Sequence, residues 1–350
     1  MSVKSIADQL SQTQEKADVL HSRALDFCML TKPRVMVLAV FTALVGLVIA
    51  PGTMRPLDAF VAVLAIAAGA GAAGVLNMWY DADIDAVMAR TALRPIPSGT
   101  VSPAEALLFG AVLAVAAIVV LGLATNFAAA ALLACAILFY VIVYTAWLKR
   151  LTPQNIVIGG VAGALPPVIG WAAATGQIGL EPLVLFLIIF LWTPPHFWAL
   201  ALNRTDEYAR AGVPMLPVIS GRAVTTRQIL VYCVLVGVTS MLPLMLGFAG
   251  PIYGAAAVAC GANLVALAIQ LRKSDEADRR APRRLFAFSI FYLFALFAAL
   301  LIDHADQPLR SAPASSSRTD AGTVHAKAPR TVRVAGASVI TGTDEVCNAA

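Results

Sequence analysis

The sequence is 350 residues long, 59% hydrophobic and only 13% charged, with a formal net charge of +5. A mean hydropathy of +0.80 excludes an ordinary soluble enzyme. Apolar windows of about 20 residues, the length of a helix that crosses a bilayer, recur along the chain. The sequence therefore predicts an all-α polytopic membrane protein that is embedded in the lipid bilayer.

Nine such windows follow one another, and each is expected to be a helix because backbone groups in lipid must hydrogen-bond within their own segment. They cover residues 34–51, 57–79, 103–124, 127–147, 155–174, 182–202, 229–249, 252–271 and 285–302. We expect three regions: a cytoplasmic N-terminal tail (1–30), a transmembrane domain (31–303) and a polar C-terminal tail (304–350). The last is rich in Ser and Ala and is expected to be disordered.

The basic residues predict the orientation of the chain. If the N-terminus lies inside, the inside segments carry 19 of the 25 Lys and Arg residues, and the short outside loops carry only Arg55. The positive-inside rule then places the N-terminus in the cytoplasm and the C-terminus outside. The positive charge is thus a topology signal and does not indicate a nucleic-acid partner. An acidic N-terminal tail without a signal-peptide core favours a bacterial inner membrane.

The first charged cluster, "NMWYDADIDAVMARTALRP" (77–95), follows the second apolar window. Asn77, Asp81 and Asp85 are spaced four residues apart and share one helix face, whereas Asp83 points elsewhere. An amide and two carboxylates suit Mg²⁺, which is usually completed by phosphate oxygens and water. Arg90 and Arg94 are candidate clamps for a diphosphate. The competing interpretation is a solvated helix end with ion pairs along the helix.

A second cluster, "ALNRTDEYARAGVPMLPVISG" (201–221), follows the sixth window and is expected on the same side. Asp206 and Glu207 are candidate metal ligands, and Arg204 is a candidate diphosphate contact. Each cluster is followed by a Pro-containing turn that ends in Ser-Gly, which suggests a weak internal duplication. A third inside loop (144–155) adds three candidate diphosphate contacts: Tyr144, Lys149 and Arg150. Positive-inside anchoring explains Lys149 and Arg150 equally well.

Longer stretches of the chain resemble one family. The first cluster is similar to the NxxxDxxxD motif of UbiA-type intramembrane prenyltransferases, and the full strings resemble the protohaem IX farnesyltransferase (haem O synthase) branch of that superfamily. The matching stretches span about residues 30–300 and leave out the C-terminal tail: "TKPRVMVL" (31–38), "NMWYDADIDAVMARTALRPIPSG" (77–99), "YTAWLKRLTPQNIVIGGVAGALPPVIGWAAATG" (144–176), "PPHFWALALNRTDEYARAGVPMLPV" (194–218) and "LFAFSIFYLFALF" (285–297).

The resemblance implies a nine-helix bundle around a central cavity and a Mg²⁺-dependent transfer of farnesyl from farnesyl diphosphate to a vinyl group of haem B, with water addition to give haem O. It implies that Asn77, Asp81 and Asp85 form the first metal-diphosphate motif and that Asp206 and Glu207 form the second. Asp81, Asp85 and Asp206 would then be the catalytic acids. Such a product further implies a haem A synthase or an oxidase assembly factor as a downstream partner.

His196 is the one histidine inside an apolar window and follows two prolines in "TPPHFW". Intramembrane ionisable groups are functional candidates, and imidazole is a usual ligand of haem iron. We therefore expect His196 to contact haem. The competing interpretation is that His196 donates to a backbone carbonyl that the prolines have freed.

Other functions are weaker fits. A secondary transporter also has internal repeats and intramembrane charge, but the acids here gather at one face of the membrane rather than at its midplane. A structural scaffold leaves the two acidic clusters unexplained. Within the enzymes, the alternative is a UbiA-type prenyltransferase that acts on a quinone-precursor aromatic acceptor.

Overall fold

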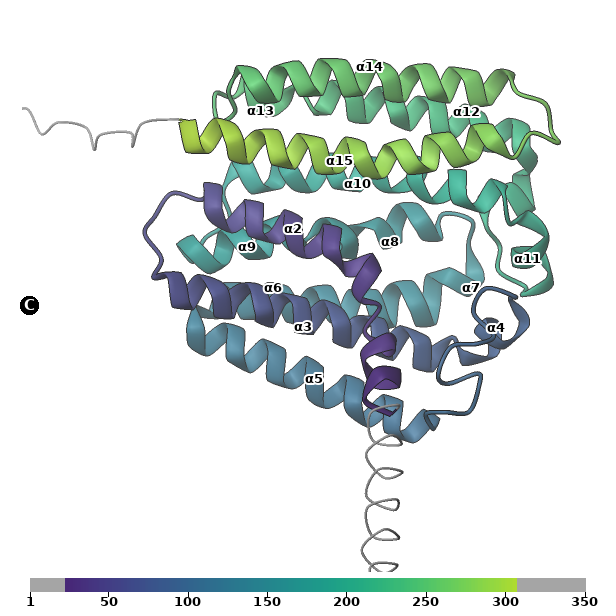
Figure 1. The fold of residues 1–350 in the computed structure, drawn as a ribbon, viewed down its shortest axis with the longest axis horizontal. Helices are drawn as coiled ribbons and strands as arrows, with labels where there is room; N and C mark the ends of the chain where they lie inside the picture. Colours follow the sequence, from purple (N-terminus) through teal and green to yellow (C-terminus); the bar gives the residue numbers. More distant parts are fainter. Residues whose placement is uncertain (1–22, 307–350) are drawn as a thin grey trace, which may run out of the picture. The chain divides into compact units, whose positions relative to one another are not determined.

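The computed structural model of the protein describes residues 23–306 (Figure 1). Within this range the regular elements are all helices and no strand is present, which confirms the predicted all-α membrane architecture. Most of both expected tails, residues 1–22 and 307–350, lies outside the described residues. The expected disorder of the C-terminal tail therefore stays a prediction.

The elements follow one another along the chain as a helical segment at Arg23–Leu30 and then a series of named helices. These are α2 (Pro33–Ile49), α3 (Pro56–Tyr80), α4 (Ala82–Val87), α5 (Pro103–Ala124), α6 (Phe127–Leu138), the π-helix η1 (Phe139–Leu148), α7 (Lys149–Leu151), α8 (Asn155–Ala164), α9 (Pro166–Thr175), α10 (Leu180–Leu202), α11 (Thr205–Arg210), α12 (Leu216–Thr239), α13 (Leu242–Met245), α14 (Pro251–Lys273) and α15 (Arg280–Asp306).

Among residues 23–306, eight helical spans are long and apolar enough to cross a membrane. A ninth is present if the segment Arg23–Leu30 and α2, which meet at an angle of 50°, are counted as one bent span. Pro33 begins α2, and proline at a first helical turn is tolerated because its missing N–H has no partner there in any helix. The predicted number of membrane spans, about nine, agrees with this range.

Two predicted spans contain breaks that periodicity does not show. The window 127–147 consists of α6 followed by η1, a ten-residue π-helix whose wider turns change which side chains face the bundle. The window 155–174 is divided into α8 and α9 just before Pro166 and Pro167. Proline cannot donate a backbone hydrogen bond, which favours an interruption at this pair.

The seventh predicted span begins too late. The expected turn "PVISG" (217–221) lies inside α12, which already begins at Leu216 rather than at 229. Gly221, with φ of 72° and ψ of 176°, is not helical and forms a kink between the short first part of α12 and the long helical part that follows. Glycine adopts that conformation readily because it has no Cβ, so the Ser-Gly pair marks the break between these two helical parts.

The helices pack as one bundle in which α2, α8 and α9 lie between an N-terminal group and a C-terminal group (Figure 1). The first group contains α3, α5 and α6, and the second contains α10, α12, α14 and α15. Glycines allow α2 and α9 to approach closely: a Cβ on Gly46 would collide with the backbone of Pro167, and one on Gly170 with the carbonyl of Ala43. Small residues at helix contacts are typical of membrane bundles.

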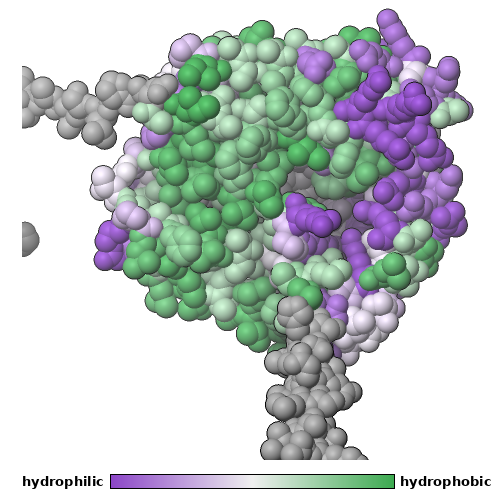
Figure 2. Space-filling model, viewed as in Figure 1, coloured by the Kyte–Doolittle hydropathy of each residue, from purple (hydrophilic) through white to green (hydrophobic). Residues whose placement is uncertain are grey.

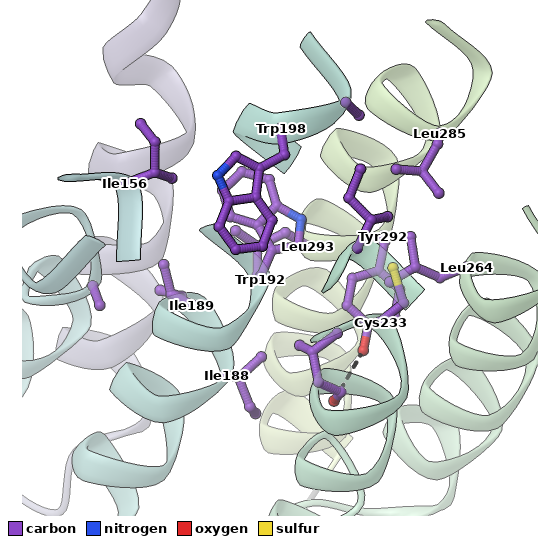
Figure 3. Close-up of a cluster of buried hydrophobic side chains, with 14 of the residues drawn as sticks. Ile156, Ile188, Ile189, Trp192, Trp198, Cys233, Leu264, Leu285, Tyr292 and Leu293 are labelled. Atoms are coloured by element: carbon purple, nitrogen blue, oxygen red, sulfur yellow. Dashed lines mark hydrogen bonds between the residues drawn. The ribbon is translucent and has the colours of Figure 1, made fainter. Parts of the chain in front are cut away.

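The largest apolar core lies between the C-terminal helices and α8 (Figure 3). Trp198 on α10, Leu264 on α14 and Leu293 on α15 are each at most 1% exposed. Figure 2 shows the outer surface: hydrophobic side chains cover most of this face, and polar ones gather at the end that carries α4 and α11. This distribution is that of a multi-pass membrane protein with one strongly polar end.

Candidate active site

The first motif lies where α3 ends at the polar end of the bundle. Asn77 is in the last turn of α3, Asp81 is the residue between α3 and α4, and Asp85 is in α4. The chain breaks from ideal helix at Asp81, yet Asp81 N–H still donates to Asn77 O and Asp85 N–H to Asp81 O. The one-face spacing survives this break, because all three side chains are buried, with exposures of 5%, 1% and 4%.

Asp83 lies off this face, as the spacing predicts. Its side chain is 62% exposed, whereas those of Asp81 and Asp85 are 1% and 5% exposed. Arg150 binds Asp83 through two hydrogen bonds of 2.7 and 2.9 Å and thereby holds the pKa of that carboxyl below its usual value. Asp83 thus forms an exposed ion pair with Arg150, whereas Asp81 and Asp85 are the buried acids available for metal binding.

Cations surround the two buried carboxylates. Lys149 Nζ donates to Asp81 Oδ2, and Arg94 donates to Asp85 Oδ2 at 2.6 Å. Arg150 also approaches Asp81 Oδ1, at 3.9 Å. Buried carboxylates need such partners because an unpaired charge away from water is very costly. Three of the predicted diphosphate contacts, Arg94, Lys149 and Arg150, therefore lie at the first motif.

Two residues that motif reasoning missed complete the arrangement. Lys32 Nζ donates to Asn77 Oδ1 at 2.6 Å, and Asn77 Nδ2 donates to Asp81 Oδ2 at 2.7 Å and to Thr145 Oγ1 at 3.0 Å. Lys32 precedes a proline in "TKPR", which is a signal for a chain bend but not for a side-chain contact. Thr145 lies on η1 and is fully buried.

Tyr144 is held beside this network by its own packing. Its ring lies 5.3 Å from that of Tyr140, measured between centroids, and fills the space that a side chain at Gly159 would need. Sequence spacing placed Tyr144 in the third loop, whereas the structure places it within the π-helix η1. The contact between η1 and α8 thus positions Tyr144.

The second cluster lies on the short helix α11 and is less enclosed. Asp206 is exposed, and Glu207 pairs with Arg204 at 3.3 Å. Arg90 donates to the hydroxyl of Tyr208 at 3.4 Å and so links the loop after α4 to α11. The two clusters share the polar end, but within residues 23–306 no group of three or more Asp, Glu, His or Cys side chains is close enough to hold a metal ion.

The first motif nevertheless fits a divalent cation. Asp81 Oδ1 is buried and has no hydrogen-bond partner among residues 23–306, so it retains a free acceptor position. Mg²⁺ is commonly bound by one or two carboxylates, with the remaining positions taken by substrate phosphates and water. Asp81 and Asp85 supply such a pair, and Lys149 and Arg94 beside them suit the phosphates. The participation of Asp206 and Glu207 stays a prediction.

His196 lies on α10 and is 9% exposed. Its ring is stacked between those of Trp192 and Phe286, at 4.3 and 4.5 Å, and its Nδ1 is 2.7 Å from Ser289 Oγ. The Ser289 hydroxyl donates to Phe286 O at 2.7 Å, so Oγ can only accept from His196 Nδ1–H. Nε2 then carries the lone pair and has no hydrogen-bond partner in the part of the chain that the structure describes.

This histidine is therefore not bonded to a carbonyl freed by Pro194 or Pro195. Its partner is a hydroxyl on another helix, α15, and Trp192 Nε1 donates to the carbonyl of the same Ser289 at 2.7 Å. These contacts fix the orientation of the imidazole ring and its tautomer, and they leave Nε2 as an acceptor or ligand. In metal-binding histidines, the group that accepts from the other ring nitrogen commonly has the same effect.

The fold and the motif together define an intramembrane enzyme, and comparison with known proteins identifies its family. The sequence profile of the UbiA prenyltransferase family matches residues 39–299. The chain belongs to this family.

Curated relatives narrow the comparison. The chain is 57% identical over 283 residues to a protein of Sinorhizobium fredii named Protoheme IX farnesyltransferase, a match that covers 80% of this chain and 89% of that relative. It is 58% identical over 282 residues to a protein of the same name from Methylobacterium radiotolerans, with the same two coverages. A third, Protoheme IX farnesyltransferase 2 of Mesorhizobium japonicum, is 55% identical and covered to 96%.

Solved structures share the fold. A digeranylgeranylglyceryl phosphate synthase matches with a TM-score of 0.67 and 20% identity over 81% of this chain and 99% of its own. A UbiA homologue from Archaeoglobus fulgidus, bound to DMAPP and Mg²⁺, matches with a TM-score of 0.55 and 15% identity over 78% of this chain and 99% of its own. At these identities the comparison establishes the UbiA fold and no finer property.

Proposed function

We propose that the chain transfers the farnesyl group of farnesyl diphosphate to a vinyl group of protohaem IX (haem B), and that water addition completes the product, haem O. The observation that carries this proposal is the buried pair Asp81 and Asp85, held among Lys32, Lys149 and Arg94 at the polar end of a membrane bundle. The names of relatives that are 55–58% identical support the acceptor and the donor.

The charges of the site suit a diphosphate leaving group. In the structure, Lys149 and Arg94 balance the two carboxylates. Asp81 and Asp85, with Asp206 or Glu207 from α11, would hold Mg²⁺, which when bound supplies positive charge that stabilises the departing diphosphate. Lys149, Arg94 and Arg150 would offer positive charge to the phosphate oxygens, and Asn77 keeps Asp81 oriented through its 2.7 Å hydrogen bond.

The reaction needs no base at the acceptor in its bond-forming step. The C1–O bond of the farnesyl group breaks, and its electron pair leaves with the diphosphate. The vinyl π pair of haem then forms the new C–C bond to C1, which leaves a cation on the adjacent carbon. Water adds there and loses a proton, giving a hydroxyethylfarnesyl group. The protein's part is to orient the two substrates and to exclude water until the C–C bond has formed.

His196 supports a haem site on the apolar side of the motif. Its Nε2 is free of hydrogen bonds within residues 23–306, and the flat rings of Trp192 and Phe286 fix the imidazole plane. We propose that this nitrogen contacts the haem iron.

The cellular setting follows from the same proposal. The bacterial relatives and the membrane spans support an inner-membrane enzyme built from residues 31–303, with the N-terminus cytoplasmic and the C-terminus outside. A haem A synthase or an oxidase assembly factor is the expected downstream partner, since haem O is too apolar to be released into water.

A reconstituted assay tests the function directly. Purified protein in lipid nanodiscs receives farnesyl diphosphate, haem B and Mg²⁺, and mass spectrometry follows the haem. We expect a farnesylated, hydrated haem whose formation stops when EDTA removes the metal. A parallel reaction replaces haem with an aromatic quinone precursor. Prenylation of that acceptor with haem unchanged would overturn the haem assignment and favour the quinone branch.

A further inference from the structure

A polar pocket lies between α14 and α15, where these two helices are joined. It has a volume of about 360 Å³, and its polar lining comes from Gln270, Ser274, Asp278, Arg280 and Arg284. Pockets that hold small ligands begin at about this size. None of these residues belongs to the two acidic clusters, and the reaction proposed above assigns them no role.

The pocket carries an excess of positive charge. Arg280 and Arg284 are four residues apart on α15 and therefore share one face of that helix. Within residues 23–306, neither guanidinium forms an ion pair or donates a side-chain hydrogen bond to a protein group. Two unpaired arginines on one wall are the usual recognition element for phosphate.

The acidic lining residue, Asp278, offsets only one of these two positive charges, and it also binds the start of α15. The carboxylate of Asp278 accepts from the backbone N–H of Arg280 at 2.7 Å and of Ala281 at 3.4 Å. Asp278 is thus engaged in capping α15. A third cation lies beside the pocket, because Arg222 of α12 donates at 2.8 Å to Ser274 Oγ, which belongs to the lining. Two helices, α12 and α15, therefore bring guanidinium groups to this pocket or its edge.

The position of the pocket indicates the source of the ligand. α14 and α15 are both membrane spans, and the pocket lies where they are joined at the polar end (Figure 1). Phospholipid headgroups lie at this level of a bilayer. Leu267 and Ala281 add an apolar part to the lining. Basic pockets between membrane helices on the cytoplasmic side commonly bind anionic lipid headgroups.

We propose that this pocket binds the phosphate group of an anionic ligand, which in a membrane is the headgroup of an anionic phospholipid. The site is separate from the reaction, so failure of the proposed function would leave it unaffected. The positive-inside rule is a different explanation of these basic residues, because it requires only positive charge near the loop and not a binding pocket. Arg272 and Lys273 lie in the last turn of α14, just before the same connection. They are exposed and do not line the pocket, so they supply a matched control.

The test uses the full chain in nanodiscs of phosphatidylcholine, into which phosphatidylglycerol is titrated. Thermal stability and native mass spectrometry report binding and retained lipid. A second arm titrates inorganic phosphate in the neutral nanodiscs. We expect wild type and the double variant R272Q/K273Q to respond alike. R280Q/R284Q should need roughly 10- to 30-fold more of the anionic lipid, the effect of removing two arginines near an anionic headgroup.

The outcomes separate the alternatives. A response to phosphatidylglycerol alone supports a lipid headgroup, and a response to inorganic phosphate that R280Q/R284Q abolishes supports the same site with a soluble ligand. Equal loss in both double variants would show a general charge effect and overturn the proposal. Absence of any response in wild type would also overturn it. Because Arg280 and Arg284 are exposed, substitution by Gln should leave the fold intact, and Ser274→Ala offers a second variant that preserves the charge.

Discussion

Lys32 combines backbone strain with a contact in the candidate active site. Its φ of 54° and ψ of 51° make it the one non-glycine residue with positive φ between residues 23 and 306. A residue before proline normally takes an extended conformation, so this geometry is costly and persists only where the surroundings impose it. The strained bend directs the amine to Asn77 Oδ1. Strain at this position is thus linked to the geometry of the metal-diphosphate motif.

The three aspartates of the first motif should differ sharply in their effect on activity. Asp81→Ala or Asp85→Ala should lower kcat by about 100-fold or more, because a charge that stabilises the leaving group is lost. Asp83→Ala removes only an exposed ion pair with Arg150 and should cost little activity. Product formation in nanodiscs measures the rates, and size-exclusion profiles check folding. Equal losses at all three positions would contradict the one-face arrangement.

Ser289 should act on haem through His196. Replacing Ser289 by Ala removes the acceptor for Nδ1–H, so the imidazole loses the tautomer that leaves Nε2 free. We expect haem affinity to fall by roughly 10- to 100-fold, as for other partners of metal-binding histidines, while the KM for farnesyl diphosphate stays constant. Haem titration followed at the Soret band measures this.

His196→Ala provides the reference for that measurement. It should shift the Soret band and weaken haem binding at least as much as Ser289→Ala. If both variants lose thermal stability but keep the haem affinity and the Soret spectrum of the wild type, His196 and Ser289 have only a structural role.

At the scale of single elements, η1 and α8 together set the position of the third loop. The π-helix brings Thr145 to Asn77 and ends next to Lys149, which reaches Asp81. Its Tyr144 ring occupies the space beside Gly159 of α8. A π-helix inserted in a membrane span is a frequent feature of functional sites, since it re-aims side chains without ending the helix.

Two glycines of α8 should therefore respond differently to the same substitution. A Cβ at Gly159 would collide with the Tyr144 ring, whereas one at Gly163 meets no atom within 4 Å. Gly159→Ala should cost about 1–3 kcal/mol of stability through overpacking and should raise the KM for farnesyl diphosphate. Gly163→Ala should be neutral or slightly stabilising, because alanine is the better helix former. Denaturation in detergent and steady-state kinetics measure both; similar effects would refute the packing argument.

At the scale of the whole molecule, the polar end unites residues from most of the chain. α4, α11 and the α14–α15 connection meet there, while the sides of the bundle are hydrophobic (Figure 2). Arg279 donates to the carbonyl of Asn203 at 2.9 Å and so ties that connection to the second cluster. This asymmetry separates a charged end, which carries both acidic clusters, from the hydrophobic surface.

The number of crossings is a prediction that belongs to this scale. If the bent pair Arg23–Leu30 and α2 crosses the bilayer, the described part of the chain spans it nine times and its two ends lie on opposite sides. Reporter fusions at the N-terminus and at the C-terminus measure this, with green fluorescent protein active inside and alkaline phosphatase active outside. We expect a cytoplasmic N-terminus and an external C-terminus. Both ends on one side would mean that the bent pair lies in the interface.

Local patterns were sufficient for several features of this protein. Hydropathy predicts the spans because every lipid-facing backbone must be helical, and i, i+4 spacing predicts the shared face of Asn77, Asp81 and Asp85. Both are properties of neighbouring residues on one helix. The same reasoning was only partly right at 217–221, where Pro, Ser and Gly indicated a loop: the residues from Leu216 are helical, and Gly221 forms a non-helical kink between two helical parts. Composition alone does not distinguish these two uses of glycine.

Contacts between distant residues were decided by tertiary packing. Lys32 reaches Asn77 across 45 positions, Thr145 reaches it across 68, and Ser289 reaches His196 across 93. No periodicity along one helix relates such pairs, since their approach depends on helix bends, on the π-helix and on close glycine contacts between helices. Sequence alone determined which chemical groups lie at the polar end. The bundle decided which of them are buried, paired or left with a free lone pair, because burial in a membrane protein depends on which helices pack against one another.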